Sequence, residues 1–371
     1  MKKILLITAF MPSRFSGGAI FTLNLLNDLS RDYYIDVLVI TREKIKSIQN
    51  YEKNITVIYI NKFWVLFKIV FFFFLNPLFI NRFSLKILLY IKKCIKQNNY
   101  DLIYFDYSQV FLYSLFFKLS NKVLNYHDVI VQKFLREKFP LSILSIPSYI
   151  FELLFSMQKN TYFITPTEKD SLLLKKFYNQ NSKHINHYLN DYILSLNNIT
   201  LSNENYFVFF GDWSRSENEE GLIWFLQNIK NYEISDHKFL IIGKDLNAKL
   251  KVKLPQLKNI EYLGFVDNPY DIISKATAII APVFRGAGIK IKVVESLACG
   301  TPVLGTRIAF EGLPVGFEKY LVLCESIEDY FSSIKSFSLS NMEKNELREN
   351  FIKIFNQNTA GSYIRNILTK N

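Results

Sequence analysis

Residues 281–306 read APVFRGAGIKIKVVESLACGTPVLGT and combine an apolar strand end, a glycine-rich loop and an amphipathic helix. Gly286 and Gly288 let the backbone approach a ligand closely, because neither carries a Cβ. The helix that we expect from near Ile289 presents outward N–H groups and a partial positive charge at its start. Since such helix starts bind phosphate groups, the segment predicts a diphosphate site.

Side chains of the same segment add charge for an anion and a ligand for hydroxyl groups. Lys290 and Lys292 oppose the helix dipole, an arrangement that is easier to understand if an anion lies between them. Glu295 follows about two turns into the helix, where its carboxylate can accept two hydrogen bonds from a ribose diol. Taken alone, the Gly-x-Gly pattern is more typical of tight packing than of phosphate binding. A dinucleotide site is disfavoured, because Ile291 replaces the third glycine of G-x-G-x-x-G.

Outward from this segment, short β-branched runs alternate with helical patterns. The first half predicts strands at residues 4–9, 35–41, 55–60, 102–105, 123–125 and 163–165, with helices at 19–29, 85–97 and 142–155. The second half predicts strands at 206–210, 239–242, 260–263, 278–281, 303–305 and 320–323, with helices at 221–229, 270–275, 289–299 and 344–367. Apolar strands separated by helices indicate parallel sheets that are covered on both faces.

The polar run LNNITLSNEN, residues 196–205, has no periodic apolar face and predicts a linker. We therefore expect an α/β protein with two doubly wound Rossmann-like domains, residues 1–195 and 205–350, facing an interdomain cleft. A closing helix within residues 351–371 could pack back on the N-terminal domain. Ligands of such sheets bind at the carboxyl ends of the strands.

The glycine-rich segment resembles the donor-site signature of the group 1 (family 4) glycosyltransferases, which have the GT-B fold. The matching residues are Pro282, Gly286, Gly288, Lys292, Glu295, Ala298, Gly300, Pro302 and Val303. The resemblance continues in three earlier stretches: residues 209–225 with Gly211 and Asn218, residues 239–245 with Gly243, and residues 262–268, which resemble the loop that touches the nucleotide base. Those last residues include Phe265 and Val266. Thr306 and residues 311–313 also match.

The resemblance implies a retaining, metal-independent transfer of a sugar from a nucleotide-diphosphate sugar, with no cofactor. The first domain would bind the acceptor, and the second the nucleotide sugar. Glu295 matches the second glutamate of the family's E-x7-E pair, which holds the ribose hydroxyls. Ala287 stands in place of the first, so recognition of the sugar must rest on the backbone of residues 286–289 or on other side chains. Arg215 and Lys290 are the candidate cations for the diphosphate.

Two features of the first domain match the family as well. Gly17 and Gly18 precede a helix after the first strand and would lie near the donor phosphate and sugar. His127 follows the strand 123–125 and matches the position beneath the sugar, where it could donate a hydrogen bond to a sugar hydroxyl while the adjacent Asp128 fixes its tautomer. Residues 106–109 follow another strand end and are positional candidates for the acceptor pocket. The three other histidines, His184, His187 and His237, are interpreted as structural.

The net charge of +12 and the pI near 9.3 indicate an anionic partner. We expect no nucleic acid, because no compact basic helix or nucleic-acid signature occurs. The apolar stretch 63–83 is interrupted by Lys68 and Asn76-Pro77, which argues against a membrane span. Two interpretations of the region 63–96 stay open: a buried helix, or a helix lying on an anionic membrane.

Three widely spaced cysteines and the lack of paired strand-end carboxylates predict neither zinc nor magnesium. No nucleophile with a base partner is found either. The sequence therefore predicts a cytoplasmic hexosyltransferase-type enzyme, which under the second interpretation of the 63–96 region is peripheral at the inner face of the plasma membrane. Its acceptor would be a lipid-linked glycan of bacterial surface polysaccharide (lipopolysaccharide or capsule) or glycolipid synthesis. The alternative, suggested by Ala287, is a non-catalytic sugar-nucleotide-binding protein on the same fold.

Overall fold

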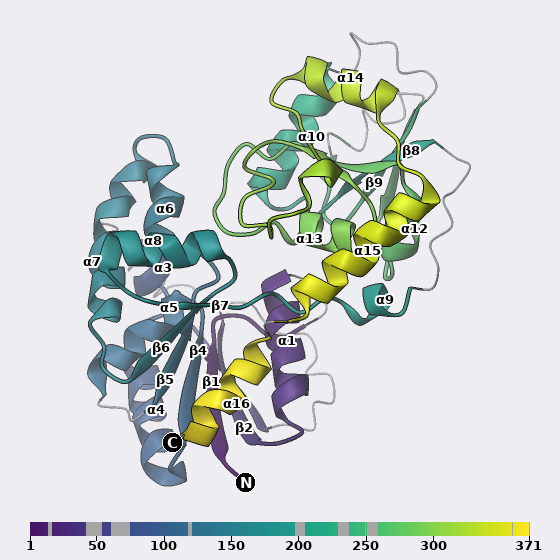
Figure 1. The fold of residues 1–371 in the computed structure, drawn as a ribbon. Helices are drawn as coiled ribbons and strands as arrows, with labels where there is room; N and C mark the ends of the chain where they lie inside the picture. The colour runs from purple at the N-terminus through teal and green to yellow at the C-terminus, as the bar shows by residue number, and fades with distance from the viewer. Residues whose placement is uncertain are drawn as a thin grey trace. The chain divides into compact units, whose positions relative to one another are not determined.

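The computed structural model describes residues 1–13, 17–41, 54–60, 75–117, 121–196, 205–228, 237–248, 250, 259–357 and 359–370. The chain divides into two compact units (Figure 1). The first unit comprises Met1–Tyr188 together with Asn358–Asn371, and the second comprises Leu189–Gln357. Each unit is built around its own parallel sheet, as expected for two doubly wound domains.

The first unit contains a seven-stranded sheet in the order β3-β2-β1-β4-β5-β6-β7. Its strands are β1 (Lys3–Thr8), β2 (Tyr34–Thr41), β3 (Asn54–Tyr59), β4 (Leu102–Asp106), β5 (Lys122–Asn125), β6 (Thr161–Thr165) and β7 (Lys183–His184). Its helices are α1 (Gly17–Leu29), α3 (Pro77–Ile80), α4 (Leu85–Asn98), α5 (Ser108–Phe111), α6 (Ile130–Leu135), α7 (Ser145–Ser156), α8 (Glu168–Tyr178) and α16 (Ala360–Lys370). All the strand pairs are parallel, so their carboxyl ends lie at one edge.

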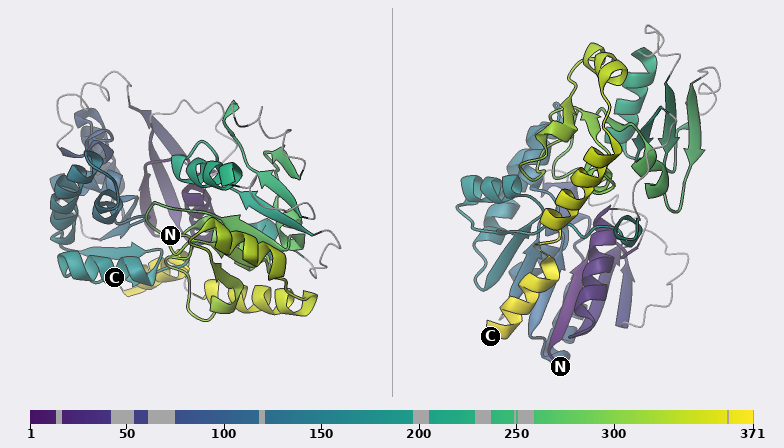
Figure 2. Two further views of the ribbon diagram at one scale, coloured as in Figure 1. Left: turned by 90° about the horizontal axis from the view of Figure 1, so that it is seen from above. Right: turned by 45° about the vertical axis from the view of Figure 1, so that its right-hand side comes forward.

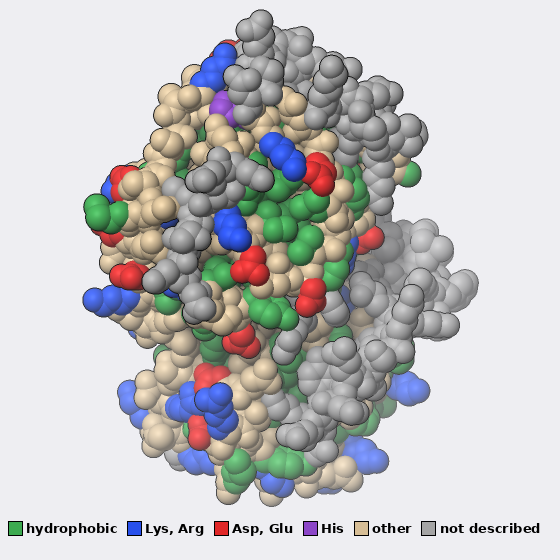
Figure 3. All heavy atoms as spheres, turned by 90° about the vertical axis from the view of Figure 1, so that its right-hand side faces the viewer, with side chains coloured by type: hydrophobic (Ala, Val, Ile, Leu, Met, Phe, Trp, Pro, Cys, Tyr) green, Lys and Arg blue, Asp and Glu red, His purple; other side chains and the backbone are tan. Residues whose placement is uncertain are grey.

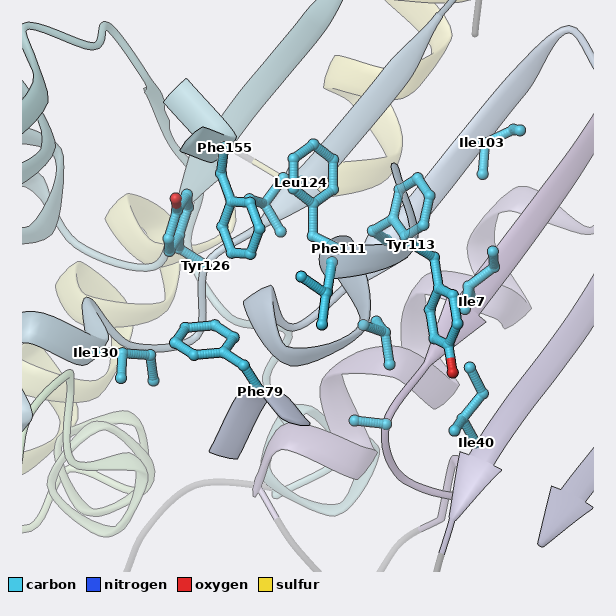
Figure 4. Packing of buried hydrophobic residues seen from close by; sticks show 14 of the residues in the cluster. Ile7, Ile40, Phe79, Ile103, Phe111, Tyr113, Leu124, Tyr126, Ile130 and Phe155 are labelled. Atoms are coloured by element: carbon cyan, nitrogen blue, oxygen red, sulfur yellow. The ribbon is translucent and has the colours of Figure 1, made fainter. Parts of the chain in front are cut away.

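Alternate residues of each strand bury on opposite faces of this sheet. In β1, Ile4 and Leu6 pack with α1 and α16, whereas Leu5 and Ile7 pack with the helices of the other face. Aromatic side chains from separate elements meet on that second face, where Phe111 of α5 and Phe155 of α7 contact at 5.2 Å between ring centroids (Figure 4). The period-2 burial is what an apolar strand inside a two-sided sheet requires.

The second unit repeats this architecture with six strands in the order β10-β9-β8-β11-β12-β13. They are β8 (Tyr206–Phe210), β9 (Lys238–Ile242), β10 (Ile260–Gly264), β11 (Ala278–Ala281), β12 (Val303–Gly305) and β13 (Leu321–Leu323). Its helices are α9 (Asp191–Leu194), α10 (Ser216–Asn228), α12 (Tyr270–Lys275), α13 (Ile291–Ala298), α14 (Ile327–Ser336) and α15 (Asn341–Phe355). Helices α12, α13 and α15 pack on one face of the sheet, and α10 and α14 on the other (Figure 2).

The structure corrects two expectations about the boundaries. The chain passes between units after Tyr188, ahead of the polar run at 196–205, because Leu189 and Ile193 are buried in the core of the second unit. The single closing helix expected at 344–367 is two helices, α15 and α16. α15 ends at Phe355 and α16 starts at Ala360, so the two halves pack in different units.

Helix α16 completes the first unit through its apolar face and one ion-pair cluster. Ile364 and Leu368 are buried in the core that β1 and α1 also form. Arg365 donates to Asp28 and to Asp32 at the end of α1, both at 2.7 Å. Gly361 is tightly packed, because a Cβ there would lie 1.9 Å from Asp28 Oδ2. The C-terminal helix is therefore an integral part of the first unit.

Helix α7 carries a buried carboxylate that holds the start of α6. Glu152 is fully buried, and its oxygens accept hydrogen bonds from the backbone of Ile130 and Val131 and from the hydroxyl of Tyr178. These contacts satisfy N–H groups that the first turn of a helix leaves unpaired. Burial nevertheless raises the pKa of Glu152 to about 7, although the three hydrogen bonds act to lower it.

This raised pKa predicts a stability that falls as the pH rises. Between the unfolded pKa of about 4.3 and the folded value near 7, the folded state retains a proton that the unfolded state has lost. Glu152 therefore favours folding most below the unfolded pKa, and this contribution declines by roughly 4 kcal/mol at most as the pH passes 7. Urea unfolding at pH 5 and pH 8 should show a smaller pH difference in Glu152→Gln than in the wild type. The exposed Glu168→Gln should behave like the wild type, and an unchanged difference in Glu152→Gln would contradict the assignment.

The apolar stretch expected to contact a membrane lies partly outside the described residues, since residues 61–74 are not among them. Within the described ranges, none of the helices has the length and apolar content that crossing a bilayer requires.

Candidate functional site

The glycine-rich loop and its helix adopt the local structure that the sequence predicts. β11 ends at Ala281, and α13 begins at Ile291, slightly later than expected. Gly286 and Gly288 have φ angles of 116° and 71°, a region that favours glycine. Ala287 lies between them, and Ile289 and Lys290 complete the loop ahead of the helix. The loop therefore reaches the start of α13 through a conformation for which glycine is well suited.

Glu295 is held by a tyrosine that the sequence analysis did not single out. Its side chain is on the second turn of α13 and only 7% exposed, and Oε1 accepts a 2.9 Å hydrogen bond from the Tyr270 hydroxyl of α12. Burial raises the pKa of Glu295 to about 7, and the hydrogen bond from Tyr270 acts in the opposite direction. The carboxyl group is thus oriented before any ligand binds.

Gly211 and Gly243 stand at the carboxyl ends of β8 and β9, next to the point where the strand order reverses between β8 and β11. Gly243 has a φ of 137°, and a Cβ there would lie 1.7 Å from the carbonyl oxygen of Gly211. The Gly243 amide donates to the Gly264 carbonyl at 2.8 Å. These loops pack backbone against backbone, and ligands of doubly wound sheets bind at such switch points.

Lys292 lies near two other positively charged side chains, those of Lys290 and Arg215. Its Nζ donates to Asn218 Oδ1 of α10 at 2.9 Å, and Asn218 in turn donates to the backbone of the loop after β8. Burial, with a contribution from the neighbouring Lys290 and Arg215, lowers the pKa of Lys292 to about 7. A nearby anion would oppose this shift. Asn218 and Lys292 are matches to the family signature, but their contact joins residues that are far apart in the sequence.

The two cations proposed from the sequence differ in placement. Lys290 Nζ lies within the loop and donates to the Gly288 carbonyl at 2.8 Å. The Arg215 side chain is 66% exposed and lies 4.0 Å from a carboxylate oxygen of Glu217. Lys290 thus belongs to the loop, whereas Arg215 lies at the surface beside it. Phe265, which is 56% exposed, and Val266 follow β10 in the same unit.

In the first unit, a buried carboxylate organises the residues around His127. Asp106, at the end of β4, is fully buried and lies 2.8 Å from His127 Nε2. It also accepts hydrogen bonds from Asn125 of β5 and from Thr22 of α1. These residues come from the carboxyl ends of two neighbouring central strands and the helix that follows β1. The sequence had suggested Asp106 only by its position.

The expectation that Asp128 fixes the tautomer of His127 is corrected. Asp106 faces Nε2, and a carboxylate accepts hydrogen bonds but cannot donate them. When a neutral His127 donates from Nε2 to Asp106, its Nδ1 is left as an acceptor for a hydroxyl group; the Asn125 amide nitrogen also lies 3.1 Å from Nε2. The imidazole also stacks on the ring of Tyr107, with 3.7 Å between centroids. His187, interpreted as structural, is buried and has its ring 6.0 Å from that of His127.

Gly17 and Gly18 begin α1 close to this cluster. A Cβ on Gly18 would lie 1.9 Å from the Tyr107 hydroxyl, so the Tyr107 side chain packs directly against the start of α1. Tyr107 itself has a φ of 82°, which is unusual for a residue with a bulky side chain. Strained residues of this kind occur at functional sites when the surroundings hold them in place.

Replacing Asp106 with Asn should reduce turnover about 100-fold, because His127 would lose the carboxylate that sets its tautomer and orientation. The measurements are kcat, the Kd for nucleoside diphosphate and the melting temperature. We expect kcat to fall while the Kd changes little, because the cations and the helix start proposed to hold the diphosphate belong to the second unit. Asp101→Asn, at the other and exposed end of β4, is the matched control. An equal fall in both variants, or a fall explained by unfolding, would refute the positioning role.

The two parallel-sheet units and the glycine-rich loop at the switch point of the second sheet define a GT-B glycosyltransferase. Residues 204–337 match the model of the family described as glycosyl transferases group 1. The resemblance deduced from the motif is thereby confirmed: this enzyme is a glycosyltransferase of group 1 type, a class that uses nucleotide sugars. No curated protein matches the chain significantly.

Solved structures share the fold along the whole chain. Sucrose-phosphate synthase from Thermosynechococcus elongatus has a TM-score of 0.72 at 15% identity, and all of both chains is covered. HepE from Anabaena, in complex with UDP-glucose, has a TM-score of 0.68 at 14% identity, with 100% of this chain and 99% of that chain covered. WaaG, a glycosyltransferase involved in lipopolysaccharide biosynthesis, has a TM-score of 0.62 at 14% identity, with 99% and 98% covered. At these identities the likeness establishes the fold.

Among the described residues, no group of three or more His, Cys, Asp or Glu side chains could hold a metal ion. The metal independence and the individual residue roles stay predictions.

Proposed function

We propose that the enzyme transfers a sugar from a nucleotide-diphosphate sugar to a lipid-linked glycan, with retention of the anomeric configuration and without a metal ion. The observation that carries this proposal is the pairing of the Gly286–Gly288 loop with the oriented carboxyl group of Glu295 on α13. The loop would hold the diphosphate, and the carboxylate would hold the ribose.

Departure of the diphosphate requires stabilisation of the negative charge that develops on it. The start of α13 offers N–H groups and a partial positive charge. Lys290 and Lys292 add cations on the same loop and helix, and Arg215 contributes from the neighbouring loop. Preorganised charges of this kind favour a charged leaving group without a metal. Because loading with a diphosphate favours the charged form of Lys292, donor binding should draw a proton onto this side chain.

The transferred sugar would be recognised without a glutamate at Ala287. We propose that the backbone of residues 286–289 contacts its hydroxyls, that His127 Nδ1 accepts a hydrogen bond from one of them, and that Gly17 and Gly18 lie near the phosphate and sugar. In the same proposal the first unit binds the acceptor, Gly211 and Gly243 shape the phosphate loops, and Phe265 and Val266 contact the base. HepE binds UDP-glucose, so UDP sugars are the first donors to test.

The proposal assigns the acceptor to the surface polysaccharide, lipopolysaccharide, capsule or glycolipid class, at the cytoplasmic face of the membrane. The involvement of WaaG in lipopolysaccharide biosynthesis supports this choice. The test is a thermal-shift screen against nucleotide sugars, followed by measurement of nucleoside diphosphate release with lipid-linked and water-soluble glycans. We expect acceptor-dependent release that EDTA does not abolish, and a product with the anomeric configuration of the donor. An inverted product, or loss of activity in EDTA with rescue by a divalent cation, would overturn the corresponding part.

A further inference from the structure

Tyr107 combines a strained backbone with an aromatic ring that is only partly buried. The residue follows β4 and has φ and ψ angles of 82° and 136°, close to a region that is populated almost only by glycine. A glycine at this position would avoid the strain that a residue with a side chain incurs. The contacts of the tyrosine side chain therefore have to offset the cost of its backbone.

Hydrogen bonds and buried neighbours hold the backbone of Tyr107 in this conformation. Its amide donates to the carbonyl of Asn125 in β5 at 3.1 Å, and its carbonyl accepts from the amide of Val110 in α5 at 3.2 Å. The two residues that precede it, Phe105 and Asp106, are fully buried at the end of β4. The surroundings thus determine the backbone angles, as is usual where strain persists at a functional site.

Partial exposure of an aromatic ring is not informative by itself. On the face of the molecule drawn in Figure 3, for example, apolar side chains are interspersed with charged ones, which is ordinary for a protein surface. Tyr107 is distinguished by the rings that it contacts. The ring of Phe10, from the loop after β1, lies 4.9 Å away at a steep angle, whereas the imidazole of His127 lies 3.7 Å away and nearly parallel.

This parallel stacking restrains the His127 ring in a direction that its hydrogen bond leaves free. The 2.8 Å contact between Nε2 and Asp106 fixes the place of one ring atom, but the ring can still tilt about that contact. An angle of 15° between the His127 and Tyr107 planes fixes the tilt. Phe21 of α1 meets the imidazole almost at a right angle, with 5.5 Å between the centroids. Together these contacts set the direction in which Nδ1 points.

The same tyrosine side chain reaches the start of α1. The Tyr107 hydroxyl occupies the space that a Cβ at residue 18 would need, at a distance of 1.9 Å. Gly17 and Gly18 are the residues that we propose to lie near the donor phosphate and sugar. Tyr107 therefore touches both of the first-unit features that are proposed to meet the transferred sugar.

We propose that Tyr107 is a positioning residue of the transfer reaction, which holds the imidazole plane of His127 at the angle that the sugar requires. The inference rests on the proposed function, because that function places His127 against the transferred sugar. The role differs from that of Asp106, which fixes one ring nitrogen. If the ring of Tyr107 only filled space beside β4, its loss would change stability and would not act through His127.

Two measurements on the full chain need no sugar donor. A stacked aromatic ring shields protons above its face, so the carbon-bound ring protons of His127 should have upfield NMR signals, which His127→Asn assigns. Tyr107→Ala should abolish this upfield shift, and Tyr107→Phe should retain it. Tyr107→Gly and Tyr107→Ala both remove the ring, but only alanine keeps the strained backbone. The glycine variant should therefore melt about 2–4 °C above the alanine variant.

The kinetic probe is the release of UDP from UDP-glucose. Tyr107→Ala should lower kcat about 10-fold, the size expected for the loss of one aromatic contact. The Kd for UDP should change little, because the cations and the helix start proposed to hold the diphosphate belong to the second unit. Tyr107→Phe should recover most of the lost turnover. In a protein that already carries His127→Ala, adding Tyr107→Ala should cause no further fall, because the ring that Tyr107 positions is gone.

The matched control is Tyr162→Ala. Tyr162 is a tyrosine of β6 and is partly buried like Tyr107, but it packs against a different core cluster of the first unit. Its replacement should lower the melting temperature and leave kcat per folded molecule unchanged.

The proposal is overturned if Tyr107→Ala leaves the His127 signals or kcat unchanged, or if the control lowers kcat as much. It is also overturned if the double variant falls below His127→Ala, or if the glycine and alanine variants are equally stable. A wild type that transfers no sugar would contradict the proposed function, whereas the NMR signals would still decide whether Tyr107 holds His127.

Discussion

Replacing Glu295 with Gln is expected to weaken the binding of nucleotide sugar and to lower kcat/KM by about 100-fold or more. A carboxylate can accept from both ribose hydroxyls, whereas an amide offers only one acceptor oxygen. A hydrogen bond to a charged group contributes about 1.5–3 kcal/mol, so losing one and weakening the other gives this magnitude. Isothermal titration with nucleoside diphosphate and steady-state kinetics measure the two effects.

The pH dependence of donor binding sharpens this prediction. Since the pKa of Glu295 is raised to about 7 by burial, a large fraction of the empty protein carries the protonated acid at neutral pH. Loss of the Lys292 proton over the same pH range lowers the affinity for a diphosphate. The ionised form of Glu295 is the better acceptor, so this carboxyl group contributes an increase in affinity from pH 6 to pH 8. Glu295→Gln should lose this contribution. Glu349→Gln, on the exposed side of α15, is the control. Undiminished affinity in Glu295→Gln would refute the ribose assignment.

Replacing Gly243 with Ala should lower the free energy of unfolding of the second unit by at least about 3 kcal/mol. The added Cβ would meet the Gly211 carbonyl oxygen at 1.7 Å and Trp213 Nε1 at 2.8 Å. The φ of 137° adds a backbone cost, because a residue with a side chain rarely adopts it. Both loops at the carboxyl ends of β8 and β9 must then move, so donor binding should be lost together with stability. Denaturant unfolding and thermal-shift titration are the measurements.

Gly264→Ala separates the two causes. Gly264 has a positive φ of 72°, but a Cβ there meets nothing within 4 Å. Its substitution should cost about 1 kcal/mol, from the backbone alone. If Gly243→Ala costs no more than Gly264→Ala, the close approach of the two loops is not rigid and the prediction fails.

The strand series could be predicted from the sequence because a short β-branched apolar run is compatible with few structures other than a strand that is buried on both faces. The loop after β11 could be predicted because glycine favours the positive φ angles that Gly286 and Gly288 adopt, and because the motif of the loop resembles a known signature. Both inferences use local information. Helix α8 and helix α14 were missed, although each begins with an acidic first turn and has a side-chain cap from Thr167 or Ser326. Their capping residues could have indicated them.

The contacts that organise the candidate site could not be predicted, because they join distant residues. Tyr270 and Glu295 belong to separate helices, and Asn218 reaches Lys292 from another loop. Asp128 was preferred over Asp106 as the partner of His127 because it is adjacent in the sequence. The chain, however, brings the ends of β4 and β5 together, and only the paired strands reveal this.

The sequence predicted a helix at 142–155 but not which of its sides faces the core. Amphipathic spacing identifies an apolar stripe, but it does not tell which stripe faces the core when the polar side also finds partners. Here Asn76, Tyr178 and the start of α6 satisfy Ser148 and Glu152, so these two polar residues are buried on the same helix as Phe155. The sequence pattern of the helix alone does not identify those partners.

The place of α16 in the first unit has a consequence for how the protein is made. The ribosome delivers strands β1 to β7 before the whole second unit, and α16 only after it. Until then, the apolar surface that Ile364 and Leu368 later cover and the carboxylates that Arg365 later pairs with face water. The first unit therefore has to wait for α16, which follows the whole second unit in the chain. Ribosome-bound chains that end before Ala360 should leave the first unit sensitive to protease.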